Sequence, residues 1–457
     1  MESSTTRRRV TIVPSSLTSS LLFRTLVSLL ALALCLCTWL SAQVPQARFQ
    51  AIAALNAAPE RQDNALVAAT TTTTTRQAQG PPPHLYPRLS HLPIFPLIPN
   101  EETLINQTLY HNQPTVAGIA AILYRFLRHL HASHERIAAA EQQQQHEPLD
   151  IFANRFQENY FGLVQEYLRP LDRAYQGRSI FPVRNDDSIF VSIAAFREHL
   201  LADTLQSAYA HAARPDQLFV GVVLQNCFWD HECWHTPRVV GMDKNGHDKL
   251  EFSNGVADPN HIATFCNLAN FSQYCDNGQV RVLYVNETEA LGPAVARYLT
   301  SKLWGGETYY VQIDSHLQFA KNWDDLYIQD LKLARNYPKA ILSTYPPGFV
   351  NFRLDPPFTP GTRLCRCQLR QQEGFLPRVE MEGRCHANDT KPTQMSFMGA
   401  GFFFARAEFL VDVPFDPFLL YLFMGEEVAL SIRAWTQGWN IYAPRQNLIG
   451  HQYRPVS

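Results

Sequence analysis

Short apolar runs alternate with helical patterns in the second half of this 457-residue chain, and this alternation limits the folds open to it. The first run, residues 189–194 (IFVSIA), is rich in β-branched residues, and residues 196–214 then place apolar side chains at helical spacing. Further strands are expected at residues 218–224, 280–284, 309–313 and 340–344, and further helices at 293–303 and 323–337. Strands alternating with helices predict an α/β fold with a mostly parallel sheet. In such sheets the ligand site lies beyond the carboxyl ends of the strands.

Composition excludes two classes of protein. Lysine and arginine number 39 against 41 aspartate and glutamate, so the net charge of −2 lacks the basic excess of a nucleic-acid-binding protein. Hydrophobic residues make up 46% of the chain and charged residues 18%, which is typical of a globular protein rather than a disordered one.

The N-terminus carries a membrane signal. Residues 25–42 (TLVSLLALALCLCTWLSA) contain no charge and approach the ~20 residues that a membrane-spanning helix needs. Arginines 7–9 and 24 precede this stretch, so the positive-inside rule predicts a cytoplasmic tail, residues 1–24, and a signal anchor. A cleaved signal peptide is the alternative, because residues 40–42 (LSA) resemble a cleavage site. The expected location is the Golgi or ER membrane as a single-pass type II protein with the bulk of the chain in the lumen, and a cytoplasmic location is the alternative.

Cysteines and glycosylation motifs fit a luminal location. Seven cysteines follow the apolar segment, at positions 227, 233, 266, 275, 365, 367 and 385. Their local clustering suits disulfides in an oxidising compartment, although an odd number leaves one free or paired between chains. N-glycosylation acceptor motifs begin at Asn106, Asn270, Asn286 and Asn388.

Three regions are expected after the anchor. Residues 43–115 include a threonine run and many prolines, and such a composition predicts a stem that does not fold. Residues 116–180 have helical periodicity and are expected to serve packing or oligomerisation. Residues 181–457 contain the predicted α/β domain.

A candidate metal site follows the predicted strand 309–313. Asp314 and His316 lie two residues apart, so the two-residue period of a strand places them on the same face. A carboxylate and an imidazole at the carboxyl end of a buried strand form half of a divalent-metal site, and mixed oxygen and nitrogen ligands suit Mn²⁺ as well as the harder Mg²⁺. An Asp-x-His triplet in a surface turn is the alternative interpretation.

Further candidate residues lie near the C-terminus. Residues 397–404 form an apolar run with two glycines, where the backbone can approach a ligand closely. Glu426 and Glu427 open a predicted helix that ends before Gly438. A strand is expected at residues 439–443, and His451 follows in a terminal loop.

The order of these motifs resembles a known family. The matching stretches are residues 189–198 (IFVSIAAFRE), 291–297 (LGPAVAR), 310–324 (YVQIDSHLQFAKNWD), 340–347 (AILSTYPP) and 415–453. Over roughly residues 185–455 the chain resembles the N-acetylglucosaminyltransferases typified by the enzyme that modifies hydroxyproline on a ubiquitin-ligase adaptor, which are related to the polypeptide GalNAc-transferases. The resemblance implies a nucleotide-sugar transferase (GT-A) fold, a UDP-GlcNAc donor, a divalent metal and retention of the anomeric configuration.

The resemblance also implies roles for individual residues. Asp314 and His316 would be metal ligands, with His451 as the third. Ser192 and Arg197 would line the uridine pocket, and Arg297 would hold the diphosphate or uracil region. Glu426 and Glu427 match the acidic element that contacts donor sugar and acceptor. Where the family often has aspartate after the arginine, this chain has Glu198. The expected reaction transfers α-GlcNAc to a hydroxyl of a polypeptide, on Ser/Thr or hydroxyproline.

The chemistry explains why such residue types are needed. Departure of UDP develops negative charge that a bound metal stabilises as a Lewis acid. The anomeric carbon becomes positively charged, and a nearby carboxylate steadies it electrostatically.

Two rival functions follow from the sequence. Residues 231–235 (HECWH) match the zinc-protease signature H-E-x-x-H, with His231 and His235 as ligands and Glu232 as general base. That chemistry requires a helix, whereas Pro237 and the lack of a helical apolar pattern favour a loop. The second rival is a catalytically inactive transferase domain that binds glycans or proteins, and the presence of all five acidic and histidine site residues argues against it.

Overall fold

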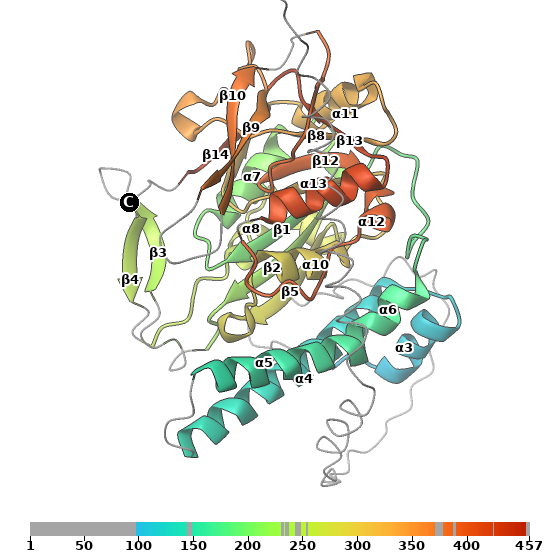
Figure 1. The fold of residues 1–457 in the computed structure, drawn as a ribbon, viewed down its shortest axis with the longest axis vertical. Coiled ribbons are helices and arrows are strands. Elements are labelled where there is room, and N and C mark those ends of the chain that lie inside the picture. The colour runs from blue at the N-terminus through green and yellow to red at the C-terminus, as the bar shows by residue number, and fades with distance from the viewer. Residues whose placement is uncertain are drawn as a thin grey trace, which may run out of the picture. The chain divides into compact units, whose positions relative to one another are not determined.

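The computed structural model describes residues 97–143, 149–229, 233, 237–242, 248–252, 255–370, 378–386, 390–423 and 425–453 (Figure 1). Outside these ranges lie the predicted anchor, the stem up to residue 96, Asn388, and His231, Glu232 and His235. Among the described residues, no helix is both long and apolar enough to cross a membrane.

An eight-stranded mixed sheet forms the centre of the fold. Its strands, in spatial order, are β11 (Thr393–Met395), β13 (Asn440–Ala443), β8 (Ala340–Ser343), β12 (Phe402–Arg406), β6 (Tyr309–Ile313), β1 (Ile189–Phe196), β2 (Leu218–Asn226) and β5 (Val280–Asn286). Strand β12 runs antiparallel to β6 and β8, and β11 runs antiparallel to β13. The other neighbouring pairs are parallel, as the alternation of strands and helices predicts.

Successive side chains of a strand point to opposite faces of the sheet, and both faces are buried. One face, here the α7 face, includes Val191 and Val311 and is covered by α7 (Leu201–His211), α8 (His261–Cys266) and α11 (Trp323–Leu333). The opposite face, here the α10 face, includes Phe190 and Tyr310 and is covered by α10 (Pro293–Ser301) and α13 (Glu426–Thr436). Burial on both faces explains why the strands are continuous apolar runs.

The N-terminal helices share the core of the α10 face. They are α3 (Glu101–Tyr110), α4 (Val116–Gln143), α5 (Leu149–Leu163), a π-helical turn (Val164–Leu168) and α6 (Arg169–Ala174). Figure 1 shows the long helices α4 and α5 beside each other. Helix α3 lies within the stretch expected to be stem, so folded structure begins earlier than the composition indicates. The helical region is thus a packed part of the α/β domain.

Helix α4 also contacts the edge of the sheet. Strand β5 is the last strand on its side, and the Tyr124 hydroxyl donates a hydrogen bond to the Val282 carbonyl of this strand at 3.3 Å. The short helix η3 (Glu287–Glu289) follows β5, and its Glu289 carboxylate lies 2.9 Å from Nδ1 of His131. The Tyr124 hydroxyl thus occupies one backbone carbonyl of the edge strand.

Three two-stranded sheets accompany the main sheet. They are β9 (Thr362–Arg370) with β10 (Arg378–His386), β3 (Pro237–Met242) with β4 (Asp248–Phe252), and β7 (Leu317–Phe319) with β14 (Ile449–His451). The sequence pattern predicted none of them, nor the antiparallel direction of β12.

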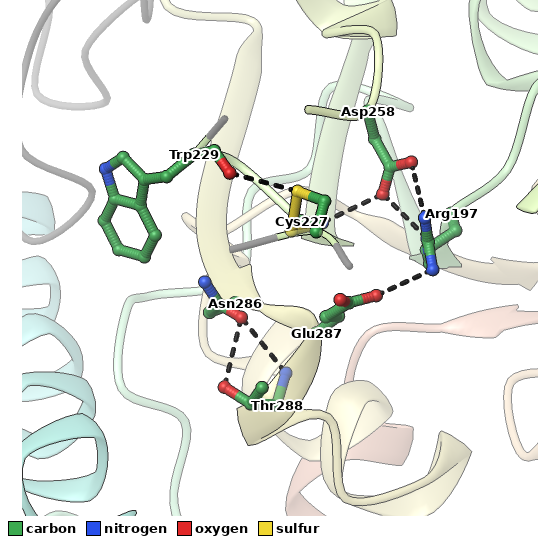
Figure 2. The surroundings of a disulfide bond; sticks show 8 residues. Arg197, Cys227, Trp229, Asp258, Asn286, Glu287 and Thr288 are labelled. Atoms are coloured by element: carbon green, nitrogen blue, oxygen red, sulfur yellow. Dashed lines mark hydrogen bonds and ion pairs between the residues drawn. A yellow bond between two sulfur atoms is a disulfide. The ribbon is translucent and has the colours of Figure 1, made fainter. Parts of the chain in front are cut away.

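Two disulfides confirm the prediction that neighbouring cysteines of the sequence pair with each other. They join Cys227 to Cys233 and Cys266 to Cys275. The side chains of the three later cysteines lie outside the described part of the structure. Asn286, the first residue of one glycosylation motif, is only 3% exposed, and its Oδ1 accepts a hydrogen bond from the Thr288 amide (Figure 2). This motif is therefore not presented to solvent in the folded protein.

Candidate active site

Two neighbouring parallel strands at the centre of the sheet, β1 and β6, are each followed by polar residues. Asp314 follows β6, and Arg197 and Glu198 follow β1. In their pairing Ile193 lies opposite Ile313, so these polar residues emerge at the same edge of the sheet. This carboxyl edge is where an α/β sheet forms its ligand site.

Strand β14 brings the third predicted metal ligand to this edge. It pairs with β7, the short strand after His316, and His451 lies opposite Leu317. The His451 amide donates to the Pro347 carbonyl at 2.9 Å, and the next amide donates to the His316 carbonyl at 3.1 Å. These backbone bonds place His451 beside Asp314, 137 positions earlier in the chain.

Asp314, His316 and His451 form a compact cluster. One ligand atom from each lies within 4.8 Å of the others, and Nε2 of His451 is 3.1 Å from Oδ2 of Asp314. Burial alone would raise the pKa of Asp314, but the hydrogen bond to His451 and the charge of Arg297 outweigh it and hold that pKa well below its ordinary value. The carboxylate is therefore ionised at neutral pH, as a metal ligand must be.

Arg297 of α10 lies between two carboxylates. Its Nη2 is 3.2 Å from Oδ1 of Asp314, and its Nη1 forms an ion pair with Glu426. Burial opposes the charge of Arg297, but Glu426 and Asp314 more than compensate and raise its pKa above the ordinary value. The site thus holds a fixed positive charge next to the proposed metal ligand.

The backbone approaches Asp314 closely at Gly401, the residue before β12. The Asp314 amide donates to the Gly401 carbonyl at 3.2 Å. A Cβ atom on Gly401 would lie 2.8 Å from Oδ2 of Asp314 and 3.9 Å from Nε2 of His451. A side chain at this position would displace the ligand carboxylate, which agrees with the close approach expected from the glycines of residues 397–404.

The two predicted catalytic carboxylates have different contacts. Helix α13 starts after Gly425, whose φ of 97° suits glycine. Glu426 is buried beside Arg297. Glu427 accepts a hydrogen bond from the Ala400 amide and another from the Tyr345 hydroxyl, each at 2.8 Å. Burial raises the pKa of Glu427. Glu426 therefore faces the Arg297–Asp314 pair, whereas Glu427 fixes the turn that carries Gly401.

Ser192 and Arg197 lie along β1 and at its end. Ser192 is 1% exposed and shares the α10 face with Phe190, two positions earlier. Arg197 has a φ of 49° and forms ion pairs with Asp258 and Glu287, both at 2.8 Å (Figure 2). Asp258 also accepts from the amide of disulfide-bonded Cys227 at 2.9 Å. The uridine contacts expected of Ser192 and Arg197 stay predictions, and the arginine fixes the loop after β2.

Sequence reasoning assigned no role to Glu198, which contacts a predicted metal ligand. Its Oε2 is 2.8 Å from Nδ1 of His316. Burial alone would raise the pKa of Glu198, but the hydrogen bonds from His316 and the Leu200 amide oppose burial, and the pKa is lowered. The signal available in the sequence was its position, because Glu198 and His316 both follow the ends of adjacent strands.

The cluster fits a divalent metal ion. One carboxylate and two imidazoles form a mixed oxygen and nitrogen donor set that suits Mn²⁺ and related ions. Among the described residues, no second trio of His, Cys, Asp or Glu side chains comes close enough to hold an ion. The residues that the sequence predicted as ligands are thus those that the fold brings together.

The solved structures to which the chain is similar include three glycosyltransferases. The chain is similar to GalNAc-T7 with UDP, GalNAc and Mn²⁺ at 15% identity and a TM-score of 0.36, covering 59% of this chain and 45% of that one. It is similar to the mannosyltransferase PcManGT of Pyrobaculum calidifontis with GDP-Man and Mn²⁺ at 12% identity and a TM-score of 0.33, covering 60% and 61%. It is similar to S. aureus TarS with UDP-GlcNAc at 12% identity and a TM-score of 0.32, covering 59% and 60%.

The chain thus spans less than two thirds of each of these three proteins. No curated protein matches the sequence significantly. A family model does match, that of Glycosyltransferase (GlcNAc), over residues 188–456. This match includes every strand of the main sheet and all eight predicted site residues. Because it covers more than half of the sequence, the chain belongs to the GlcNAc glycosyltransferase family.

Proposed function

We propose that the protein is a metal-dependent, retaining transferase that moves α-GlcNAc from UDP-GlcNAc to a hydroxyl of a polypeptide. Family membership supports the GlcNAc donor. The observation that carries the proposal is the cluster of Asp314, His316 and His451 at the carboxyl edge of the sheet, with Arg297 3.2 Å from Asp314. The acceptor hydroxyl, on Ser/Thr or hydroxyproline, rests on the family resemblance alone.

The three clustered residues would hold the metal. When bound, the ion would act as a Lewis acid for the charge that develops on the departing diphosphate. Arg297 adds a fixed positive charge on the same side, and burial strengthens its effect because the local dielectric is low. Ser192 and Arg197 are proposed to line the uridine pocket beside β1.

The carboxylate of Glu426 is proposed to act on the sugar. It is buried, and it is oriented by its ion pair with Arg297. A fixed carboxylate there would steady the positive charge of the anomeric carbon. Glu427 supports the same site by holding the Ala400 amide. Retention is best explained by attack of the acceptor hydroxyl on the face that UDP leaves, and a covalent glycosyl-enzyme is the alternative route.

A donor screen tests the proposed reaction. Purified protein is incubated with Mn²⁺, a peptide library and one of UDP-GlcNAc, UDP-GalNAc, UDP-Gal or UDP-Glc. UDP-GlcNAc should turn over fastest, and Asp314→Ala should lose this turnover. A clear preference for UDP-Gal or UDP-Glc would refute the donor assignment.

The same preparation distinguishes the two rival functions. Tight binding of UDP and Mn²⁺ without turnover of any donor would favour a binding module. Casein hydrolysis that disappears in Glu232→Gln would favour the metalloprotease.

We also propose that the protein is a type II membrane protein of the Golgi or ER. The uncharged stretch at residues 25–42 supports this location. Full-length protein expressed in a eukaryotic cell should fractionate with membranes and lose mass on treatment with an N-glycosidase. A soluble product that is insensitive to the glycosidase would instead support a cytoplasmic enzyme.

A further inference from the structure

His316 has two ring nitrogens, and its contact with Glu198 indicates which one carries the proton. Oε2 of Glu198 lies 2.8 Å from Nδ1 of His316. An ionised carboxylate only accepts hydrogen bonds, so the Nδ1 atom facing it must be the donor. In the neutral ring Nε2 then keeps its lone pair, which is the electron pair that a metal ion binds.

Glu198 is itself held in place. It is buried, with 7% of its surface exposed, and its other oxygen accepts a hydrogen bond from the Leu200 amide at 3.0 Å. The same oxygen lies 3.3 Å from Nδ1 of His199. Because each oxygen has its own partner, the carboxylate has little freedom to turn away from His316.

The second histidine of the cluster has no comparable support. Nε2 of His451 faces Asp314 at 3.1 Å, while its Nδ1 is buried without a hydrogen-bond partner in the described structure. Packing orients this ring instead, between His316 and Tyr453, at centroid distances of 4.7 and 4.2 Å. The two histidines are therefore fixed by different means.

We infer that Glu198 is a positioning residue, which holds His316 in the Nδ1–H tautomer and directs Nε2 toward the metal. Carboxylates behind metal-binding histidines fix the ring and increase its basicity. The inference rests on the proposed metal-dependent function, because it requires an ion at the Asp314 cluster.

The first test observes the tautomer without metal. Protein labelled with ¹⁵N in histidine is studied by long-range ¹H–¹⁵N spectra, and His316 is assigned by comparison with His316→Gln. The protonated nitrogen should be Nδ1 in the wild type. In Glu198→Ala it should shift toward Nε2, the tautomer that free imidazole side chains prefer. An unchanged tautomer in Glu198→Ala would overturn the inference.

The second test measures Mn²⁺ affinity by titration calorimetry and by the EPR signal of free Mn²⁺. Loss of such a supporting carboxylate commonly weakens metal binding by about 10- to 100-fold, and we expect this range for Glu198→Ala. Glu198→Gln keeps a single acceptor oxygen, which can face His316 or the Leu200 amide but not both, because these donors contact different carboxylate oxygens. Its loss of Mn²⁺ affinity should therefore be smaller than that of Glu198→Ala.

Two further variants make the outcomes distinct. His199→Ala removes the neighbouring ring that contacts the same carboxylate, and its Mn²⁺ affinity should equal that of the wild type. Asp314→Ala removes a proposed ligand. If the wild type and Asp314→Ala bind Mn²⁺ equally weakly, the proposed metal site fails. If Asp314→Ala loses binding while Glu198→Ala retains full affinity, only the role of Glu198 is refuted.

Discussion

Nη2 of Arg297 lies 3.2 Å from Oδ1 of Asp314, so a buried guanidinium and the proposed metal would share one carboxylate. Arg297 also pairs with Glu426, which couples the metal side of the site to the sugar side. The positive charge of Arg297 therefore offsets the negative charges of both Asp314 and Glu426.

Replacing Arg297 by methionine should destabilise the fold. Removal of one partner from a buried ion pair leaves uncompensated charge and typically costs about 3–5 kcal/mol. The free energy of unfolding, measured with urea, should fall by this amount. The double variant Arg297→Met/Glu426→Gln should recover part of the loss. In it, Asp314 is the only carboxylate that has lost its guanidinium partner. A loss below ~1 kcal/mol in the single variant would contradict a buried, mutually dependent pair.

The metal ligands should differ in their importance. Asp314→Ala removes the sole carboxylate of the cluster and should abolish Mn²⁺-dependent turnover. His451→Ala should weaken Mn²⁺ binding by roughly 10- to 100-fold, and excess Mn²⁺ should partly restore activity. Calorimetry and initial rates measured against Mn²⁺ concentration check both. Normal Mn²⁺-dependent activity in Asp314→Ala would show that the metal binds elsewhere.

Gly401→Ala tests the geometry of the site without changing its charge. The new Cβ would meet Oδ2 of Asp314 at 2.8 Å and would have to displace it. We expect weaker Mn²⁺ binding in a folded protein. Gly162→Ala in α5 is the matched control, because no atom lies within 4 Å of its new Cβ and alanine favours the helix. Equal Mn²⁺ affinity in both variants would refute close approach at Gly401.

Glu289 should make stability depend on pH. Burial would raise its pKa, but hydrogen bonds with His134 and His131 of α4 outweigh burial and lower it. A folded pKa below the unfolded value of about 4.3 gives stability that is present above that pH and is lost as pH falls through the folded pKa. The difference in unfolding free energy between wild type and Glu289→Gln should therefore be largest near neutrality and shrink below about pH 4. A difference that is constant from pH 7 to 3 would contradict this linkage.

The family match begins at residue 188, but the structure predicts that this boundary does not give a stable domain. Helices α3–α6 share the core of the α10 face, so their removal exposes apolar surface. A protein of residues 97–457 should be monodisperse in size-exclusion chromatography, whereas residues 188–457 should aggregate or bind a hydrophobic dye. Soluble, active 188–457 would show that the helices are dispensable.

The sequence predicted six of the eight strands of the main sheet, because these six appear as short apolar runs. It did not predict β11, which includes the exposed Gln394, and it did not assign β12 as a strand. The clustering of Asp314 and His316 could be predicted from their place after β6. Hairpin β9–β10 and the antiparallel direction of β12 could not be predicted. Strand direction depends on which neighbours a strand pairs with, and apolar periodicity carries no such information.

Contacts between distant residues were the other limit. Nothing in the local pattern places Glu289 beside His131, or Tyr345 beside Glu427, because these pairs come from separate elements. Arg197 was expected at a ligand, and its two ion pairs become visible only when Asp258 and Glu287 are brought beside it (Figure 2). Such contacts between residues far apart in the sequence can be identified only from the three-dimensional structure.

The hydrogen bond from Tyr124 to Val282 has a consequence for synthesis of the protein. It joins residues 158 positions apart, and the helix that donates it is made first. At about 5–20 residues per second, the ribosome needs roughly 8–32 s to extend the chain from Tyr124 to Val282. Helices α3–α6 are complete at Ala174, so in the later part of this interval they exist without the edge strand β5 of the sheet against which they pack. Apolar surface exposed in this way during synthesis is prone to aggregation, so the time before β5 is made is the stage at which the nascent helices are most exposed to it.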